Sequence, residues 1–305
     1  MELKQLKYFT HVAELGSYTR AAEVIDVAQP VLSRQIRQLE IELRQNLLIR
    51  HGRGVILTDA GKTLLEHSRI ILQQLELAYE DLSLSDGKLN GHVFLGIPPT
   101  LVKLISVDVV KAFKEQLPDA NLTIIEALTA NLEESIHLGR IDIALLNNPT
   151  ASAHIDTHLL AEEELFLICD INAPLTKNME SITLKEVAAL PLITPCPPNT
   201  FRMLLEQEML KMDLKPNIAW EIDSIGIIMK LVAEGMGYAI LSRFSLTLVK
   251  QGNQFKAIPI TSPTLINRLY LGISSKRIPT RLHKKMSSLL TEVCKQHFPS
   301  RENNQ

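Results

Sequence analysis

A change of periodicity near Gly91 constrains this fold more than any other feature of the sequence. Residues 1–85 carry apolar side chains mostly at helical spacing. After Gly91, strand-like apolar runs such as 93–97 alternate with helical segments such as 101–117. This alternation predicts a parallel sheet with crossover helices. We therefore expect a mainly helical N-terminal part followed by an α/β part.

The composition is that of an ordinary soluble globular protein. The chain has 305 residues, of which 46% are hydrophobic and 22% are charged, which excludes a collagen, a low-complexity polymer and a largely disordered chain. The 32 basic and 34 acidic residues give a net charge of −2. No strong global field therefore attracts the chain to nucleic acid or membrane, although a local basic patch remains possible.

The cysteines and the N-terminus indicate a cytoplasmic protein. Cys169, Cys196 and Cys294 are too few and too far apart for a disulfide framework or a zinc cluster. A thiol near a helix N-terminus, such as that of Cys196, could have a lowered pKa, but it has no obvious resolving partner. The first residues mix charged and apolar side chains, unlike a signal peptide, and no apolar run is long enough for a membrane span. We expect no metal and no cofactor.

Three short helices open the chain. Gly16 ends the first, Ser17 caps the second, and Pro30 lies in the first turn of the third, which extends to about Arg44. Four apolar residues of the third helix share one side: Leu32, Ile36, Leu39 and Leu43. Four polar residues occupy the other side: Gln29, Ser33, Arg34 and Arg37. A helix, a tight break and a second amphipathic helix predict a helix-turn-helix.

The polar side of this third helix has the chemistry of a DNA-reading surface. Gln29 can pair with a base edge, and Ser33 can bind a base or a phosphate. Arginine side chains bind phosphates or guanine. Between residues 29 and 53 there are five arginines and two acids, a local charge of 5 − 2 = +3. For any amphipathic helix taken alone, a merely solvated polar face is the commoner explanation.

A predicted hairpin after the third helix favours DNA binding. The apolar runs 47–49 and 55–57 flank a glycine-containing turn. Arg50 and Arg53 lie at its tip. A wing beside a recognition helix commonly touches the neighbouring phosphates, so we expect both arginines to contact DNA.

The next helix is expected to run from Thr58 to about Ser85, longer than a usual globular helix. Two interleaved heptad series form an a/d seam, which is expected where one helix pairs with another. The first series is Leu64, Ile71 and Ala78, and the second is Ser68, Leu75 and Leu82. We predict that the apolar members form a dimer interface. The polar stretch 85–91 is the expected domain boundary.

Four segments at residues 16–23, 28–40, 47–50 and 57–61 resemble the DNA-binding domain of LysR-type transcriptional regulators. They read GSYTRAAE, AQPVLSRQIRQLE, LLIR and LTDAG. Within that family, residues 28–30 and 48–50 resemble most the nitrogen assimilation control protein branch. The resemblance is specific over residues 1–65 and extends along the whole chain in length and element order.

The resemblance implies an α+β multidomain fold. A winged helix-turn-helix at residues 1–58 would precede a dimerising linker helix and hinge at 59–90. An α/β effector domain with a periplasmic-binding-protein fold would occupy residues 91–305. Such regulators usually bind interrupted palindromic DNA as homotetramers, activate target operons, often repress their own gene and can contact RNA polymerase. The residues matching the recognition helix and wing are Gln29, Pro30, Ser33, Arg34, Arg37, Arg50 and Arg53.

Two positions depart from the family pattern. Ala28 stands where the family usually has a helix-capping serine, a loss of ~0.5–2 kcal/mol of helix stability. Arg44 stands where the family usually has glycine, so it must adopt a left-handed conformation at some cost or extend the helix.

We expect the effector domain to form two lobes. Lobe one would comprise residues 91–162 and 267–305, and lobe two residues 163–266. Folds of this kind bind ligands between lobes through loops and helix N-termini, so we predict a small, anionic organic effector there. Arg202 is the only cation expected near it. The candidate contacts are Thr100, Asn147, Thr194, Cys196, Thr200, Arg202 and Asp223.

The sequence is also compatible with other functions. The sequence has no GxGxxG, GxxxxGK, GxSxG or HExxH motif, so we do not expect an enzyme. A solute-binding protein would share the alternating half but would leave residues 1–85 unexplained. A regulator of the nitrogen-control branch could also act through its abundance alone, without an effector.

Overall fold

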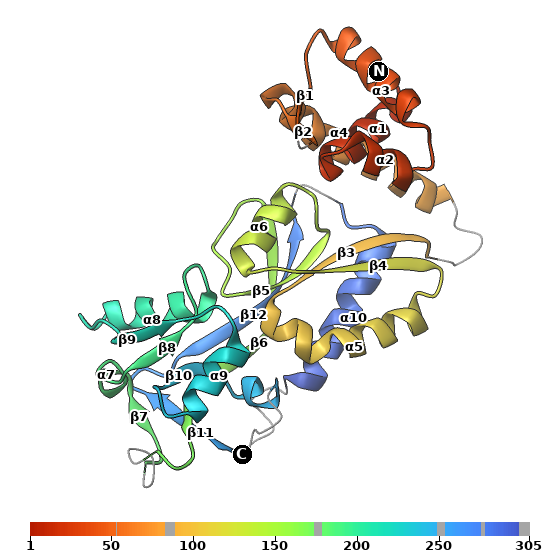
Figure 1. The fold of residues 1–305 in the computed structure, drawn as a ribbon. Helices are drawn as coiled ribbons and strands as arrows, with labels where there is room; N and C mark the ends of the chain where they lie inside the picture. The colour runs from red at the N-terminus through yellow and green to blue at the C-terminus, as the bar shows by residue number, and fades with distance from the viewer. Residues whose placement is uncertain (53, 83–88, 174–178, 249–253, 276–277, 299–305) are drawn as a thin grey trace. The chain divides into compact units, whose positions relative to one another are not determined.

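The computed structural model describes residues 1–52, 54–82, 89–173, 179–248, 254–275 and 278–298. The chain divides into two compact units, one formed mainly by residues 1–88 and the other by most of residues 89–305. Figure 1 shows helices and a small hairpin in the first unit and strands mixed with helices in the second.

Three helices and a hairpin build the N-terminal unit, as predicted. Gly16 ends α1 in a left-handed conformation with φ 60°, and the Ser17 hydroxyl caps α2 by accepting from the Arg20 N–H at 3.3 Å. Ala28 provides no side-chain cap, and Arg44 ends α3 with φ 54°. Arg44 therefore adopts the left-handed conformation instead of extending the helix. The elements are α1 (Leu3–Leu15), α2 (Tyr18–Val24), α3 (Gln29–Leu43), β1 (Leu48–His51), β2 (Gly54–Leu57) and α4 (Asp59–Leu82).

The apolar side of α3 forms the core of this unit. Leu32, Ile36 and Leu39 are fully buried against Phe9 of α1 and Leu47 before β1. Removing each of these five side chains from water stabilises the folded unit by roughly 1.5–3 kcal/mol. Their burial leaves the opposite side of α3 facing solvent. Arg69 of α4 donates twice to Glu14 of α1, at 2.8 and 2.9 Å, and ties the long helix to the same core.

The C-terminal unit is built on a mixed sheet with strand order β4-β3-β5-β12-β6-β11-β7, and β10 pairs with β6. Only part of the predicted parallel arrangement is found: β3 pairs in parallel with β4 and β5, whereas β12 runs antiparallel to β5 and β6. The first elements are β3 (Gly91–Ile97), α5 (Pro99–Gln116), β4 (Ala120–Glu126), α6 (Thr129–His137) and β5 (Ile143–Asn147).

The remaining elements complete two lobes. They are β6 (Ile155–Asp170), β7 (Ile182–Thr183), α7 (Leu184–Val187), β8 (Leu192–Thr194), α8 (Thr200–Leu210), β9 (Ile218–Glu221), α9 (Ile225–Ala233), β10 (Ala239–Ser242), η2 (Arg243–Leu248), β11 (Phe255–Thr261), β12 (Ile266–Ser274) and α10 (Arg281–His297). The alternation of strand-like runs and helical segments in the sequence does not mark β7, α7, η2, β11 or the first half of β6.

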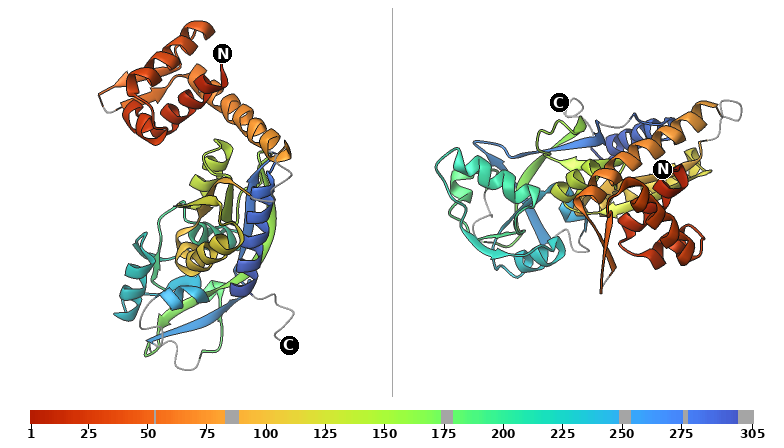
Figure 2. Two further views of the ribbon diagram at one scale, coloured as in Figure 1. Left: turned by 90° about the vertical axis from the view of Figure 1, so that its right-hand side faces the viewer. Right: turned by 90° about the horizontal axis from the view of Figure 1, so that it is seen from above.

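Two large apolar cores lie on either side of the region where β6 passes from one lobe to the other. In lobe one, α5 and α10 cover β3, β5 and β12. In lobe two, α8 and α9 pack against β8, β10 and the second half of β6. The right-hand view of Figure 2 shows α8 and α9 gathered apart from α5 and α10. No helix in the described part of the chain is long and apolar enough to cross a membrane.

Candidate functional site

The structure places the candidate DNA-reading residues on the solvent side of α3. Pro30, Arg34 and Arg37 are exposed, and Gln29 and Ser33 are half-buried. Arg34 forms no ion pair with any described residue, so its charge is available to a phosphate. The predicted contact Arg53 lies outside the described residues.

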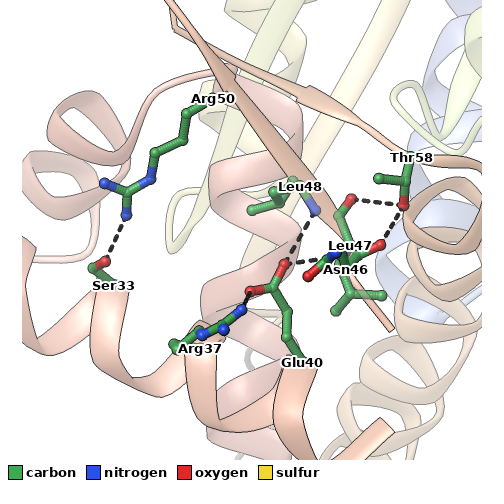
Figure 3. Close-up of polar contacts among 8 residues, drawn as sticks. All are labelled: Ser33, Arg37, Glu40, Asn46, Leu47, Leu48, Arg50 and Thr58. Atoms are coloured by element: carbon green, nitrogen blue, oxygen red, sulfur yellow. Dashed lines mark hydrogen bonds and ion pairs between the residues drawn. The ribbon is translucent and has the colours of Figure 1, made fainter. Parts of the chain in front are cut away.

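Arg50 of the wing contacts the recognition helix. Its Nη2 donates to the Ser33 hydroxyl at 2.7 Å (Figure 3). Its guanidinium lies 4.7 Å from the centre of the Tyr18 ring. Because Ser33 accepts from Arg50, the hydrogen of its hydroxyl is left to donate to another acceptor. The arrangement suits recognition of a phosphate oxygen or a base acceptor in the major groove.

Glu40 joins the recognition helix to the wing and was missed as a functional residue in the sequence. One carboxylate oxygen accepts from the Leu47 and Leu48 N–H groups at 2.9 and 3.3 Å, and the other pairs with Arg37 at 3.4 Å (Figure 3). In the sequence Glu40 only reduces the local charge. In the structure it satisfies two backbone donors at the start of β1 and so holds the hairpin beside α3.

A pocket of about 300 Å³ lies between the lobes of the C-terminal unit. The first residues of α5, α6, α8 and α9 all line it. Free N–H groups and the helix dipole make a helix N-terminus favourable for an anion. Among the predicted contacts, the residues lining the pocket are Thr100, Asn147, Thr200 and Asp223.

Arg202 is not the cation of this pocket, which corrects the expectation from sequence. Its side chain is buried, donates to the Thr194 hydroxyl at 2.5 Å and pairs with Glu206 and Glu221 at 2.8 and 3.0 Å. Neither Arg202 nor Thr194 is among the described residues that line the pocket. The cation that does line it is Lys103, one turn along α5 from Thr100. Lys103 follows Thr100 by three residues, so both lie on one side of the predicted helix, and this spacing is the sequence signal that could have identified Lys103.

Cys196 also lies outside the pocket lining. Its backbone N–H donates to the Asp223 carboxylate at 2.9 Å. Burial, and then the hydrogen bond to Asp223, raise the pKa of the Cys196 thiol. A raised pKa reduces the thiolate fraction at neutral pH, which argues against an oxidant-sensing role. Burial likewise raises the pKa of Cys294 to about 12.

Family models cover nearly all of the described chain. The bacterial regulatory helix-turn-helix model of the lysR family matches residues 3–62, and the LysR substrate binding domain model matches residues 86–295. The chain belongs to the LysR family of transcriptional regulators. The recognition made from sequence is confirmed, and this LysR-type regulator binds DNA through its helix-turn-helix.

Curated relatives agree with the nitrogen-control resemblance. The nitrogen assimilation regulatory protein nac of Escherichia coli K12 is 34% identical over 294 residues, which cover 96% of this chain and 95% of the relative. The nac protein of Klebsiella aerogenes is 32% identical and covers 90% of each chain. A solute-binding protein would not account for the matched helix-turn-helix.

Solved structures share the fold. A full-length OxyR variant from Pseudomonas aeruginosa superposes with a TM-score of 0.81 at 21% identity, covering 97% of this chain and 95% of the other. Full-length CbnR in complex with its target DNA has a TM-score of 0.60 at 22% identity, covering 97% and 99%. The predicted winged helix-turn-helix with a two-lobed effector domain is therefore confirmed.

The linker helix α4 of this LysR-type regulator leaves part of its seam uncovered within one chain. Leu64 and Leu75 are half-buried, while Ile71 and Ala78 are exposed. The side chain of Leu82 and the expected end of the helix at residues 83–85 lie outside the described part of the chain. Tyr79, which the heptad series omits, is 63% exposed. These residues leave an apolar surface available to a partner helix.

Proposed function

We propose that this regulator changes its activity when a small organic anion binds in the interlobe pocket. The observation that carries the proposal is the convergence of four helix N-termini on one cavity, together with the Lys103 ammonium. Glu126 and Asp223 also line the pocket, so a polyphosphate would meet repulsion and is not the expected ligand.

The proposal includes assembly and target. Two copies would pair through the apolar seam of α4, and a dimer of dimers would bind an interrupted palindromic operator. Support comes from the exposed apolar residues Ile71 and Tyr79 and from family membership. We infer that the protein acts in the cytoplasm and has no enzymatic activity, because its relatives are transcriptional regulators.

A ligand-independent regulator that acts through its own abundance is the alternative. Its similarity to the two nac proteins is the observation that favours it. Under this alternative, the interlobe pocket is a feature of the inherited fold without a ligand.

Thermal unfolding of the full chain with a panel of small mono- and dicarboxylates separates these proposals. At a ligand concentration of 100 Kd, binding stabilises the folded chain by ~2.7 kcal/mol, a shift of several degrees. We expect Lys103→Gln and Thr100→Val to lose most of that shift. Lys111→Gln, an exposed charge change elsewhere on α5, is the matched control and should retain it. An equal response in all four proteins would place the ligand elsewhere, and no response across the panel would favour the ligand-independent alternative.

A further inference from the structure

A second, smaller cavity adjoins the interlobe pocket and contains a buried carboxyl group. The two cavities share Thr100, Asn147 and Phe201 as lining residues. The smaller one has a volume of about 10 Å³, close to what one water-sized group needs. Glu163 of β6 lies in this cavity.

Amide and hydroxyl groups from both lobes surround Glu163. It stands opposite Asn267 in the β6–β12 ladder, and the polar side chains of Asn267 and Ser242 lie beside its carboxyl group, where they partly offset the effect of burial on its pKa. Asn267 also donates to Asn147 at 3.1 Å and accepts from Asn148 at 2.9 Å. The carboxyl group therefore lies beside a network of amide groups that extends into the wall of the interlobe pocket.

No counter-ion for this carboxyl group is found among the described residues of the cavity. The other lining residues, from α5, β5, α8, β10, η2, β12 and the segment just after α10, are all uncharged. The adjacent Glu162 is paired with Arg268 at 2.7 Å, and Arg243 is placed over the Phe166 ring. Among the described atoms, Oε1 of Glu163 is buried without a hydrogen-bond partner. Burial raises the pKa of Glu163 to about 7.

A buried, unpaired carboxylate is costly, and a cation that hydrogen-bonds to it removes that cost. We propose that Glu163 is the recognition group for a single ammonium group at this end of the interlobe site. Its free oxygen accepts one N–H, and neighbouring hydroxyl and amide oxygens can accept others. The ammonium group belongs either to a free ammonium ion or to an amine carried by the effector. Only the second source rests on the proposed function.

The raised pKa makes this binding depend on pH. Below pH 7 the Glu163 carboxyl group is mostly protonated and neutral, so it binds an ammonium group only weakly. Between pH 6 and 7 affinity should rise several-fold, and above pH 7 it should level off. In the unliganded protein, the cost of ionising Glu163 grows between its unfolded pKa of 4.5 and its folded pKa of about 7. Glu163→Gln should therefore gain stability relative to the wild type as pH rises to 8.

Thermal unfolding of the full chain in matched concentrations of ammonium, potassium and tetramethylammonium chloride tests the site. At pH 8 we expect ammonium to raise the melting temperature of the wild type above its value in the other two salts. The difference should shrink at pH 6 and vanish in Glu163→Gln. The nearby exchange Glu162→Gln, which leaves the buried carboxyl in place, should behave as the wild type does.

The source of the ammonium group is tested with three compound sets: simple primary amines, α-amino acids and amine-free carboxylates. Stabilisation by amino acids far below the concentration needed for ammonium chloride, lost in Glu163→Gln, would assign the amine to the effector. Stabilisation by ammonium alone would assign the free ion. Equal effects of potassium and ammonium, or an unchanged response in Glu163→Gln, would overturn the proposal. Carboxylates that still stabilise Glu163→Gln would leave the proposed function standing while this inference failed.

Discussion

Leu75→Asp is expected to halve the mass of the particle in light scattering or reduce it further. Leu75 lies on the seam of α4, where Ile71 and Ala78 are exposed within one chain. Placing a carboxylate in a helix–helix interface buries a charge without a partner, which costs several kcal/mol. Operator affinity should fall by about 10²–10⁴, because each half-site would then bind without the effective concentration that pairing supplies.

Gln74→Asp is the matched control for this substitution. Gln74 is the exposed neighbour of Leu75 on the same helix, so the change adds the same charge off the seam. It should leave mass and affinity near their wild-type values. A Leu75→Asp protein that remains fully assembled would place the main interface outside α4.

The second large effect is expected at the recognition helix. Ser33→Ala removes the hydroxyl that Arg50 orients, and a lost base contact costs ~1–3 kcal/mol of discrimination between specific and non-specific DNA. Gln29→Ala should do the same at its own position. Arg50→Ala should reproduce much of the Ser33→Ala effect, because the Ser33 hydroxyl would then be free to rotate.

Arg34→Ala should act differently, because we expect the exposed charge of Arg34 to bind phosphates. It should weaken binding to all sequences and reduce the slope of log affinity against log salt by about 1. Lys111→Ala, which removes a charge from α5, should change neither quantity. Titration of a specific and a random probe at several salt concentrations measures both effects. If Ser33→Ala and Arg34→Ala titrated like the wild type on both probes, α3 would not be the reading helix.

The N-terminal unit could be predicted in detail because its signals are local. Gly16, Ser17 and Pro30 mark helix ends through their own backbone or side-chain chemistry. The burial of Leu32 and Ile36 follows from helical spacing. The hydrogen bonds of Glu40 and Arg50 could not be predicted, because they join residues that approach only when the hairpin folds against α3.

In the C-terminal unit, some elements depend on contacts between residues far apart in the sequence, so local patterns could not predict them. The first half of β6 carries exposed polar residues at 156–158, so neither alternation nor an apolar run marks it as a strand. It is a strand because β12 pairs with it along nine residues. The charge run 162–164 likewise resembles a solvated segment, and only the pairing of β6 with β12 shows that an oxygen of the half-buried Glu163 is enclosed.

The same limit applies to the interlobe pocket. Loops after strands and before helices could be identified in the sequence, and four of the residues predicted there as effector contacts line the cavity: Thr100, Asn147, Thr200 and Asp223. The position of Arg202 could not be predicted, because its charge is paired with Glu221, which β9 brings beside α8. A cation in the first turn of a helix is available to a ligand only if no folded neighbour neutralises it.

Selection of binding sites from a random DNA library by the full chain tests the central claim most directly. If α3 reads the major groove in a dimer joined by α4, the enriched sequences should form an interrupted palindrome whose half-sites are separated by whole helical turns. Selection with Ser33→Ala should give the same spacing with information lost at one symmetric pair of positions. Enrichment of an asymmetric single site, or a Ser33→Ala motif identical to that of the wild type, would contradict the account.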